Sequence, residues 1–249
     1  MAELANKVAM ITGASGNLGS AVARRFLAAG ARLVLVDHGK GRQSAQFPDL
    51  EASSDHILID AIDAGSPDLM RWAVEQTLQH FDHLDVLVNT VGGYEAGQPL
   101  HETSLETWEA MINLNARSVF VACQAVIPAM LEQRSGKIIN VAARSGLAGA
   151  ARNAAYAAAK AAVIRLNESM AAELKNDGIN VNCVLPGTID TPRNRAEMPK
   201  SDPGRWVTAE SLAEVILFLA SDAARFVTGE TISADGGMAR TLDLYGGPV

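Results

Sequence analysis

Cysteine is scarce in this chain, which has only two, Cys123 and Cys183, among its 249 residues. The two lie far apart in sequence, each in an apolar run, so they form neither a redox spacing nor a zinc-binding spacing. We expect both to be buried, reduced thiols of a cytoplasmic protein. The five histidines are scattered, and none pairs with Cys or Glu at a ligand spacing, so the sequence predicts no metal site.

Positive charge is also in short supply, because Lys and Arg number 21 against 28 Asp and Glu, a formal net charge of −7. Nucleic acids and anionic membranes repel such a chain, so neither is expected as a partner. The first residues, MAELANKVAMITG, lack the charged and apolar regions of a signal peptide, and no apolar run approaches the length that spans a bilayer. With nucleic acid and membrane set aside, we expect a small-molecule substrate as the partner.

Apolar residues, in contrast, make up 48% of the chain, and its length suits one large α/β domain. Short apolar runs predict strands at residues 7–12, 31–37, 56–60, 84–89, 137–141, 179–185 and 230–234. Helical patterns cover residues 18–29, 67–81, 104–134, 153–175 and 209–220. The polar segment 39–54 predicts a short helix broken near Pro48, and residues 186–206 predict a long ordered loop.

The order of these elements indicates the fold. Apolar strands without alternation, each followed by a helix, are typical of a parallel sheet covered on both faces. Right-handed crossovers make such a sheet doubly wound. No repeat or linker divides the chain, so we expect an α/β fold with a single Rossmann domain over residues 1–249. Its sheet should have about seven strands, with helices on both faces.

The first strand runs into a glycine-rich segment, TGASGNLG at residues 12–19, and then into a helix. Small residues there permit a tight turn and let the helix N-terminus approach a pyrophosphate. Asp37 ends the second strand, where it can accept hydrogen bonds from ribose hydroxyls and repel a 2′-phosphate. NAD(H) is therefore the preferred cofactor, and NADP(H) stays open because Lys40 or Arg42 could reach a phosphate.

Together with later motifs, this segment resembles the short-chain dehydrogenases/reductases. That family usually opens with TGxxxGxG, which Thr12, Gly13 and Gly19 match, whereas Asn17 stands at the middle glycine. Asn tolerates positive φ, so we expect Asn17 to keep the turn. The other motifs, in order, are the acid Asp60, NTVG at 89–92, Asn115 in MINLNARSVF, YAAAK at 156–160, PGTIDT at 186–191 and VTGETISADGG at 227–237.

The resemblance implies functional residues and an oligomer. Its cofactor-binding residues are Thr12, Gly13, Ser15, Asn17, Leu18, Gly19, Asp37, Asp60, Asn89, Val91, Gly92, Tyr156, Lys160, Pro186, Gly187, Ile189 and Thr191. Similar proteins pack the two long helices, here about 104–134 and 153–175, against copies of themselves, so a homodimer or homotetramer is expected.

Tyr156 and Lys160 lie one helical turn apart on the same face. A tyrosine is a poor proton donor or base at neutral pH, but a nearby ammonium stabilises the phenolate and is expected to lower its pKa. Tyr156 can then exchange a proton with the substrate while a hydride moves at the nicotinamide. The resemblance implies that Asn115 completes the catalytic group and that Lys160 also holds the ribose hydroxyls.

One residue departs from the family pattern. The active-site serine normally stands thirteen residues before the tyrosine, and here that position is Ala143. Three interpretations are open. The substrate needs no polarising hydroxyl, Ser145 or a loop residue supplies one, or the protein binds NAD without catalysis as a regulatory or scaffold protein.

A narrower resemblance supports the first interpretation. The segment DTPRNRAEMPKSDPGRW at 190–206 and the GGY at 92–94 resemble those of quinonoid dihydropteridine reductases, which also have alanine at the serine position and prefer NADH. The leading hypothesis is therefore an NADH-dependent reductase of a small conjugated acceptor such as a quinonoid dihydropterin. Its rival is a carbonyl or secondary-alcohol oxidoreductase that uses Ser145.

The substrate pocket should lie over the C-terminal ends of the strands, with residues 186–206 as a lid. Its candidate residues are Tyr94, Ala143, Arg144, Ser145, Asn194 and Trp206. Tyr94 or Trp206 could stack on a flat heteroaromatic ring.

Overall fold

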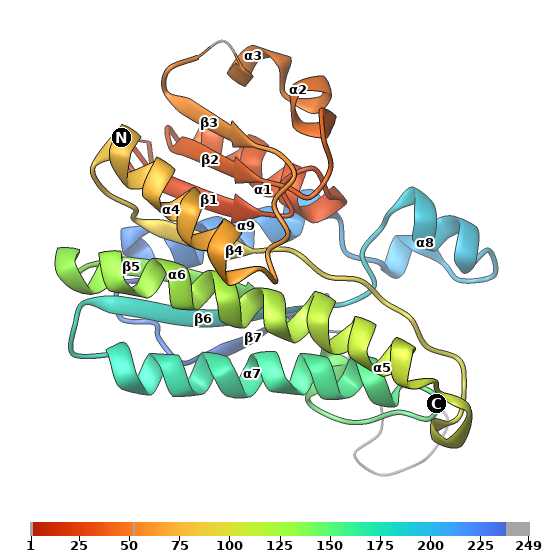
Figure 1. Ribbon diagram of the computed structural model, residues 1–249. Helices are drawn as coiled ribbons and strands as arrows, with labels where there is room; N and C mark the ends of the chain where they lie inside the picture. The colour runs from red at the N-terminus through yellow and green to blue at the C-terminus, as the bar shows by residue number, and fades with distance from the viewer. Residues whose placement is uncertain (1, 52, 238–249) are drawn as a thin grey trace.

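The structure, a computed structural model, describes residues 2–51 and 53–237. Its centre is a seven-stranded sheet in the order β3-β2-β1-β4-β5-β6-β7, and every neighbouring pair is parallel (Figure 1). The strands are β1 (Val8–Thr12), β2 (Arg32–Val36), β3 (His56–Ile59), β4 (Val86–Asn89), β5 (Gly136–Val141), β6 (Ile179–Pro186) and β7 (Thr231–Ala234). The predicted doubly wound fold is confirmed, with strand ends within about two residues of those expected.

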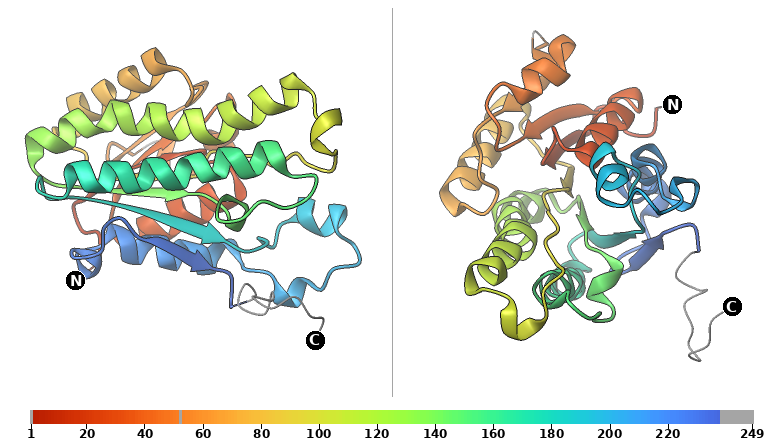
Figure 2. Two further views of the ribbon diagram at one scale, coloured as in Figure 1. Left: turned by 90° about the horizontal axis from the view of Figure 1, so that it is seen from below. Right: turned by 90° about the vertical axis from the view of Figure 1, so that its right-hand side faces the viewer.

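Helices cover both faces of the sheet. They are α1 (Asn17–Ala28), α2 (Arg42–Gln46), α3 (Pro48–Glu51), α4 (Pro67–Phe81), α5 (Leu105–Ile112), α6 (Ser118–Gln133), α7 (Ala154–Leu174), α8 (Pro192–Glu197) and α9 (Ala209–Ala220). Figure 2 shows α6 and α7 on one side of the sheet and α9 on the other. One buried core packs against α4, α6 and α7, and a second packs against α1 and α9.

The strand sequences explain the two cores. Successive side chains of a strand point to opposite faces, so a strand covered on both sides must be apolar throughout. In β1 all five residues are buried, and Val8 and Met10 join the first core while Ala9 and Ile11 join the second. The same division runs through β2 and β4, which fixes the register of the central strands.

The single long helix expected over residues 104–134 is wrong in detail. Helices α5 and α6 are joined by a π-helical segment, η2 (Asn113–Arg117), which contains the buried Asn115. A π turn adds one residue to a helical turn, and reading residues 104–134 as a single apolar run does not show the resulting shift in phase. The inserted residue turns the side chain of Asn115 toward the interior of the molecule.

This helical stretch, Leu105–Gln133, is also long and apolar enough to cross a membrane by length and composition alone, contrary to the sequence-based expectation. More than half of its apolar window, 56%, is buried inside the structure. Its second part, α6, packs against the sheet beside α4 and α7 and contributes Val119, Val126 and Met130 to the first core (Figure 1).

Residues 186–206 are not the plain loop that the sequence predicted. They contain α8 and the short 3-10 helix η4 (Pro203–Arg205). The side chain of Thr191 caps α8 by accepting the amide of Asn194 at 3.1 Å, and Pro192 occupies the first helical position. Residues 42–51 form the two short helices α2 and α3, which are separated at Phe47, next to the break predicted near Pro48.

A chain of buried side-chain hydrogen bonds crosses the middle of the sheet. Thr12 Oγ1 donates to Asn89 Oδ1 at 3.2 Å, and Asn89 Nδ2 donates to Asn140 Oδ1 at 2.9 Å. Asn140 Nδ2 then donates to Asn167 Oδ1 on α7 at 3.2 Å. These four residues are at most 1% exposed. Because buried amides must be paired, this chain fixes β1, β4, β5 and α7 relative to one another.

Replacement of Asn140 with alanine should lower the free energy of unfolding by about 1–3 kcal/mol, because it leaves amide groups of Asn89 and Asn167 buried without a partner. Urea unfolding followed by circular dichroism measures the change. The matched control is Asn176→Ala, which truncates an exposed asparagine just beyond the same helix α7 and should change stability by less than about 0.5 kcal/mol. An equal, small effect of both substitutions would contradict the proposed role of the buried chain.

Candidate active site

The glycine-rich turn after β1 forms the first wall of the site. Gly13 adopts a left-handed backbone (φ +70°), and its amide donates to the Val36 carbonyl at 2.8 Å. A Cβ at Gly19 would collide with the carbonyl oxygen of Gly13, so α1 can pack this close to the turn only with glycine there. Asn17 is the first residue of α1. The expectation that Asn17 supplies a positive φ is wrong, because Gly13 already makes the turn.

Asp37, which follows β2, closes this turn from the other side. Its Oδ2 accepts the amide and hydroxyl of Ser15 at 2.9 and 2.7 Å, and its Oδ1 accepts the amide of Gly39 at 3.0 Å. Burial acts to raise the pKa of Asp37, but the hydrogen bonds from Ser15 and Gly39, with the charge of Arg42, outweigh it and hold the pKa below its ordinary value. The carboxyl group is therefore ionised at neutral pH.

Asp60 follows β3 and lies beside the same turn region. Its Oδ2 accepts the amide of Gly41 at 2.6 Å, and its Oδ1 is buried with no hydrogen-bond partner in the described part of the chain. An orphaned acceptor of this kind suits an adenine amino group. With Asp37 available for ribose hydroxyls and the α1 N-terminus for phosphates, the residues present fit a nicotinamide adenine dinucleotide.

The segment after β4 approaches the turn from the middle of the sheet. Thr90 Oγ1 donates to the Thr12 carbonyl at 2.7 Å, and a Cβ at Gly13 would lie 3.1 Å from the Val91 amide nitrogen. The motifs at residues 12–19 and 89–92 therefore meet, as the resemblance implied. Thr90 was not among the predicted residues, although its place between Asn89 and Val91 in the NTVG motif could have indicated it.

Asn115 fixes the next residues of this segment. Its Nδ2 donates to the Gly93 carbonyl at 3.0 Å, and its Oδ1 accepts the Gly93 amide at 3.2 Å. Gly92 lies between Asn115 and Lys160, because a Cβ there would be 3.0 Å from Asn115 Oδ1 and 3.4 Å from Lys160 Nζ. The π turn thus places Asn115 as a clamp on the loop that enters the site.

Tyr156 and Lys160 project from the first turns of α7. The ammonium of Lys160 lies 5.8 Å from the centroid of the Tyr156 ring and donates to the Val141 carbonyl at 3.0 Å. Burial lowers the pKa of Lys160 to about 8. Burial, and then the neighbouring Tyr94, raise the pKa of Tyr156 to about 12. The expected lowering of the tyrosine pKa is therefore not found in this structure, because burial disfavours the phenolate.

Tyr94 packs directly on Tyr156. The two ring centroids are 4.9 Å apart with an interplanar angle of 86°, and Tyr94 remains 55% exposed. Its loop is held at both ends, at Gly93 by Asn115 and at Gly97, whose amide donates to the Arg152 carbonyl at 2.8 Å. Tyr94 is thus an aromatic wall with a fixed backbone beside Tyr156.

The region around the missing serine is polar in spite of Ala143. Ala143 is followed by the 3-10 helix η3 (Arg144–Gly146), which contains two of the predicted substrate residues. Arg144 Nε lies 3.6 Å from Asp235 Oδ2 in an ion pair. Ser145 Oγ accepts a hydrogen bond from Asn153 Nδ2 at 3.1 Å. Asn153, the N-cap residue of α7, was not predicted, although it stands only three residues before Tyr156.

The PGTIDT segment leaves the end of β6 and enters the candidate lid. A Cβ at Gly187 would lie 3.1 Å from the Cβ of Asp235, which brings this segment against the residues that follow β7. Asn194 Nδ2 donates to the Ile189 carbonyl at 2.7 Å, so this predicted substrate residue is used within the segment itself. Trp206 is half-buried, and the adjoining Val207 pairs with Ile189 in an isolated bridge.

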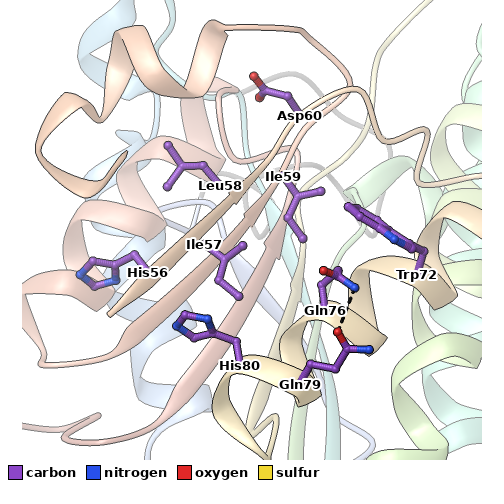
Figure 3. A pocket seen from close by; sticks show the side chains of 9 residues that line it. All are labelled: His56, Ile57, Leu58, Ile59, Asp60, Trp72, Gln76, Gln79 and His80. Carbon is purple, nitrogen blue, oxygen red and sulfur yellow. Dashed lines mark hydrogen bonds between the residues drawn. The ribbon is translucent and has the colours of Figure 1, made fainter. Parts of the chain in front are cut away.

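A separate groove of about 540 Å³ lies between the edge strand β3 and helix α4. Figure 3 shows His56, Ile57 and Ile59 on its strand side and Trp72, Gln76 and Gln79 on its helix side. Three strands separate β3 from β5, so this groove is remote from Tyr156, and it shares only Asp60 with the candidate nucleotide site.

Comparison with known proteins supports these assignments at the level of the family. Residues 7–202 match the family model described as short chain dehydrogenase. The 3-oxoacyl-[acyl-carrier-protein] reductase FabG of Chlamydia trachomatis is 35% identical over 95% of this chain and 98% of its own length. The cis-4-hydroxycyclohexanecarboxylate dehydrogenase of Sinomonas cyclohexanicum is 35% identical over 94% of this chain and 96% of its own.

Among solved structures, levodione reductase superposes with a TM-score of 0.87 at 29% identity, covering 96% of this chain and 99% of the other. The fold, the order of the motifs and these relatives agree. The chain belongs to the short-chain dehydrogenase/reductase family and is an oxidoreductase of the class that uses NAD(P)(H).

Proposed function

We propose that this oxidoreductase uses NAD(H) to reduce a small, planar, conjugated acceptor such as a quinonoid dihydropterin. The observation that carries the proposal is the ring of Tyr94, which stands edge to face on Tyr156 and leaves 55% of its surface exposed. An aromatic wall beside the proton donor suits a flat heteroaromatic ring. Ala143 offers no hydroxyl at the usual polarising position, and a quinonoid acceptor needs less polarisation than a ketone.

The chemistry divides between cofactor and protein. A nicotinamide adenine dinucleotide held by the glycine-rich turn and Asp37 would supply the hydride from its nicotinamide ring. Tyr156, whose pKa of about 12 keeps it protonated at neutral pH, donates its phenolic proton to an oxygen or nitrogen of the acceptor. Lys160, one helical turn further on, would hold the ribose hydroxyls of the bound cofactor. Residues 186–206, with α8, close over the acceptor and exclude water.

The preference for NAD(H) rests on Asp37. Its carboxylate is ionised and fixed by Ser15 and Gly39, so a 2′-phosphate placed there would meet a like charge. Arg42, which lies against Gly39, and the exposed Lys40 are competing features, because the cation of either could pair with a phosphate.

A second candidate is a carbonyl or secondary-alcohol oxidoreductase. It is favoured by the hydrogen bond between Asn153 and Ser145, which fixes a hydroxyl two residues beyond Ala143. The names of the relatives also refer to a 3-oxoacyl group and to a hydroxycyclohexanecarboxylate, which are substrates of that chemistry.

The first test is oxidation of NADH against freshly generated quinonoid dihydropterin and against a panel of ketones. We expect turnover with the pterin, and we expect Tyr156→Phe to lower kcat by about 10²- to 10⁴-fold, because it removes the proton donor. The affinity for NADH, measured by fluorescence titration, is the control and should change little. If the ketones turn over and the pterin does not, the second candidate is correct. If NADH binds but nothing turns over, the protein binds NAD without catalysis.

Replacement of Asp37 with serine should change the cofactor preference. The ratio of kcat/KM for NADPH to that for NADH should rise about tenfold or more, because a like charge is removed while Arg42 remains. The comparison is steady-state kinetics with both cofactors. Asp49→Ser, which removes an exposed acid from the nearby helix α3, is the matched control and should leave the ratio unchanged. An unchanged ratio in Asp37→Ser would refute the role given to this carboxylate.

We also propose a cytoplasmic homodimer or homotetramer that packs through its long helices. Burial raises the pKa of Cys123 and Cys183 to about 12, and two buried reduced thiols suit a reducing compartment. Trp108 on α5 and Phe120 on α6 are 39% and 48% exposed, an arrangement common at subunit contacts.

Light scattering should therefore give two or four chain masses, and Phe120→Asp should reduce the mass by placing a charge in the apolar contact. Trp72→Asp is the control, because Trp72 is similarly exposed, at 47%, but lies on α4. A monomer mass for the unaltered chain would rule the oligomer out.

A further inference from the structure

Ser145 is held beside the turn of α7 that carries Lys160. The residue after it, Gly146, packs against the helix so closely that a Cβ there would lie 2.7 Å from the carbonyl carbon and oxygen of Lys160. Any other residue at position 146 would push η3 away from α7. The short helix η3, which carries Ser145, therefore packs directly on the backbone of α7, and this contact fixes its position.

Asn153 adjoins a polar stripe on one face of α7. Tyr156, Lys160 and Asn167 follow one another at intervals of four and seven residues, which places them on one side of the helix, and Asn153 is the N-cap residue at its start. Asn153, Lys160 and Asn167 are buried, at 9%, 4% and 0% exposed, and Tyr156 is half-buried. Asn153 thus stands at the N-terminal end of the row that contains the proton donor.

The hydrogen bond between these two residues has a direction. Asn153 Nδ2 donates to Ser145 Oγ at 3.1 Å, so the serine oxygen accepts and its own hydrogen is left to donate elsewhere. A hydroxyl that accepts one hydrogen bond becomes a stronger donor in the next.

The same asparagine leaves an unusual defect. Its Oδ1 is buried without a hydrogen-bond partner among the residues that the structure describes. A buried unpaired carbonyl costs free energy, and such a defect in a native protein calls for an explanation. Here the amide orientation that leaves Oδ1 unpaired is the one that lets Nδ2 reach Ser145.

We propose that Asn153 is a positioning residue that holds the Ser145 hydroxyl as a hydrogen-bond donor to the substrate, in place of the serine that Ala143 has lost. The substrate class is then an acceptor with a carbonyl oxygen close to the carbon that receives the hydride, either a ketone or the lactam carbonyl of a conjugated heterocycle. Ser145 transfers no proton to the substrate and forms no covalent bond with it. The transferred proton still comes from Tyr156. The proposal rests on the proposed hydride transfer with Tyr156 as donor.

A double-mutant cycle tests this assignment. Ser145→Ala and Asn153→Ala should each lower kcat/KM by about 10- to 100-fold, less than the 10²- to 10³-fold typical of a dedicated oxyanion donor, because Tyr156 also binds the oxygen. The double variant should lose no more than the more damaged single variant, since both changes remove one donor. Ser145→Thr, which keeps the hydroxyl, should restore most of the activity.

A graded series of acceptors distinguishes loss of a polarising donor from general damage to the structure of the site. If a polarising donor is lost, kcat/KM should fall most for an unactivated ketone and least for a quinonoid acceptor. A misfolded site would lose activity equally with all acceptors. Asn153→Asp, which keeps the size but removes the donor to Ser145, replaces Asn153→Ala if that variant does not fold. Asn176→Ala, exposed beyond the far end of α7, is the control and should keep full activity.

The outcomes separate this proposal from the function on which it rests. Full activity of Ser145→Ala in an enzyme that Tyr156→Phe inactivates would overturn the proposed donor and leave the oxidoreductase intact. Additive losses in the double variant would overturn the positioning role of Asn153. Absence of turnover by the unaltered enzyme with every acceptor, despite NADH binding, would overturn the proposed function and the donor with it.

Discussion

The buried hydrogen-bond chain from Thr12 through Asn89 and Asn140 to Asn167 is the constraint on which the rest of the site depends. A parallel sheet with both faces covered has an apolar interior, so four polar side chains inside it must satisfy one another. Their partners belong to β1, β4, β5 and α7. The strand that carries the nucleotide turn and the helix that carries Tyr156 are therefore held by one set of bonds, and neither can shift without breaking it.

Two departures from regular structure complete the site within this frame. The π turn at Asn113–Arg117 rotates Asn115 inward, where it bonds both backbone groups of Gly93 and fixes the loop that bears Tyr94. The 3-10 helix at Arg144–Gly146 depends on a glycine that permits contact with the Lys160 backbone. Asn115 and Ser145, both candidate site residues, lie on these departures, which agrees with the tendency of irregular backbone to occur at functional sites.

Sequence patterns predicted the strands, the order of the motifs and the family, because each depends on residue type and spacing. The runs that form β1 and β2 are apolar at nearly every position, which indicates strands buried between two layers of helices. The π turn was missed because reading residues 104–134 as a single apolar run does not show the shift in phase that the added residue causes. The partnership of Ser145 with Asn153 was missed because it joins a loop to a helix through packing. Positive φ was assigned to Asn17 instead of Gly13 because the motif identifies a turn but does not say which residue makes it.

The tyrosine pKa shows how burial changes the meaning of a motif. The YxxxK spacing alone suggests a phenol made acidic by its lysine, yet burial raises the pKa of Tyr156 to about 12 and lowers that of Lys160 to about 8. Desolvation disfavours both charged forms, so at neutral pH the phenol keeps its proton. A protonated phenol beside a proton-accepting substrate is arranged to give a proton and not to take one. The protonated phenol is the form that the proposed reduction requires of Tyr156, whereas the reverse oxidation would require the phenolate.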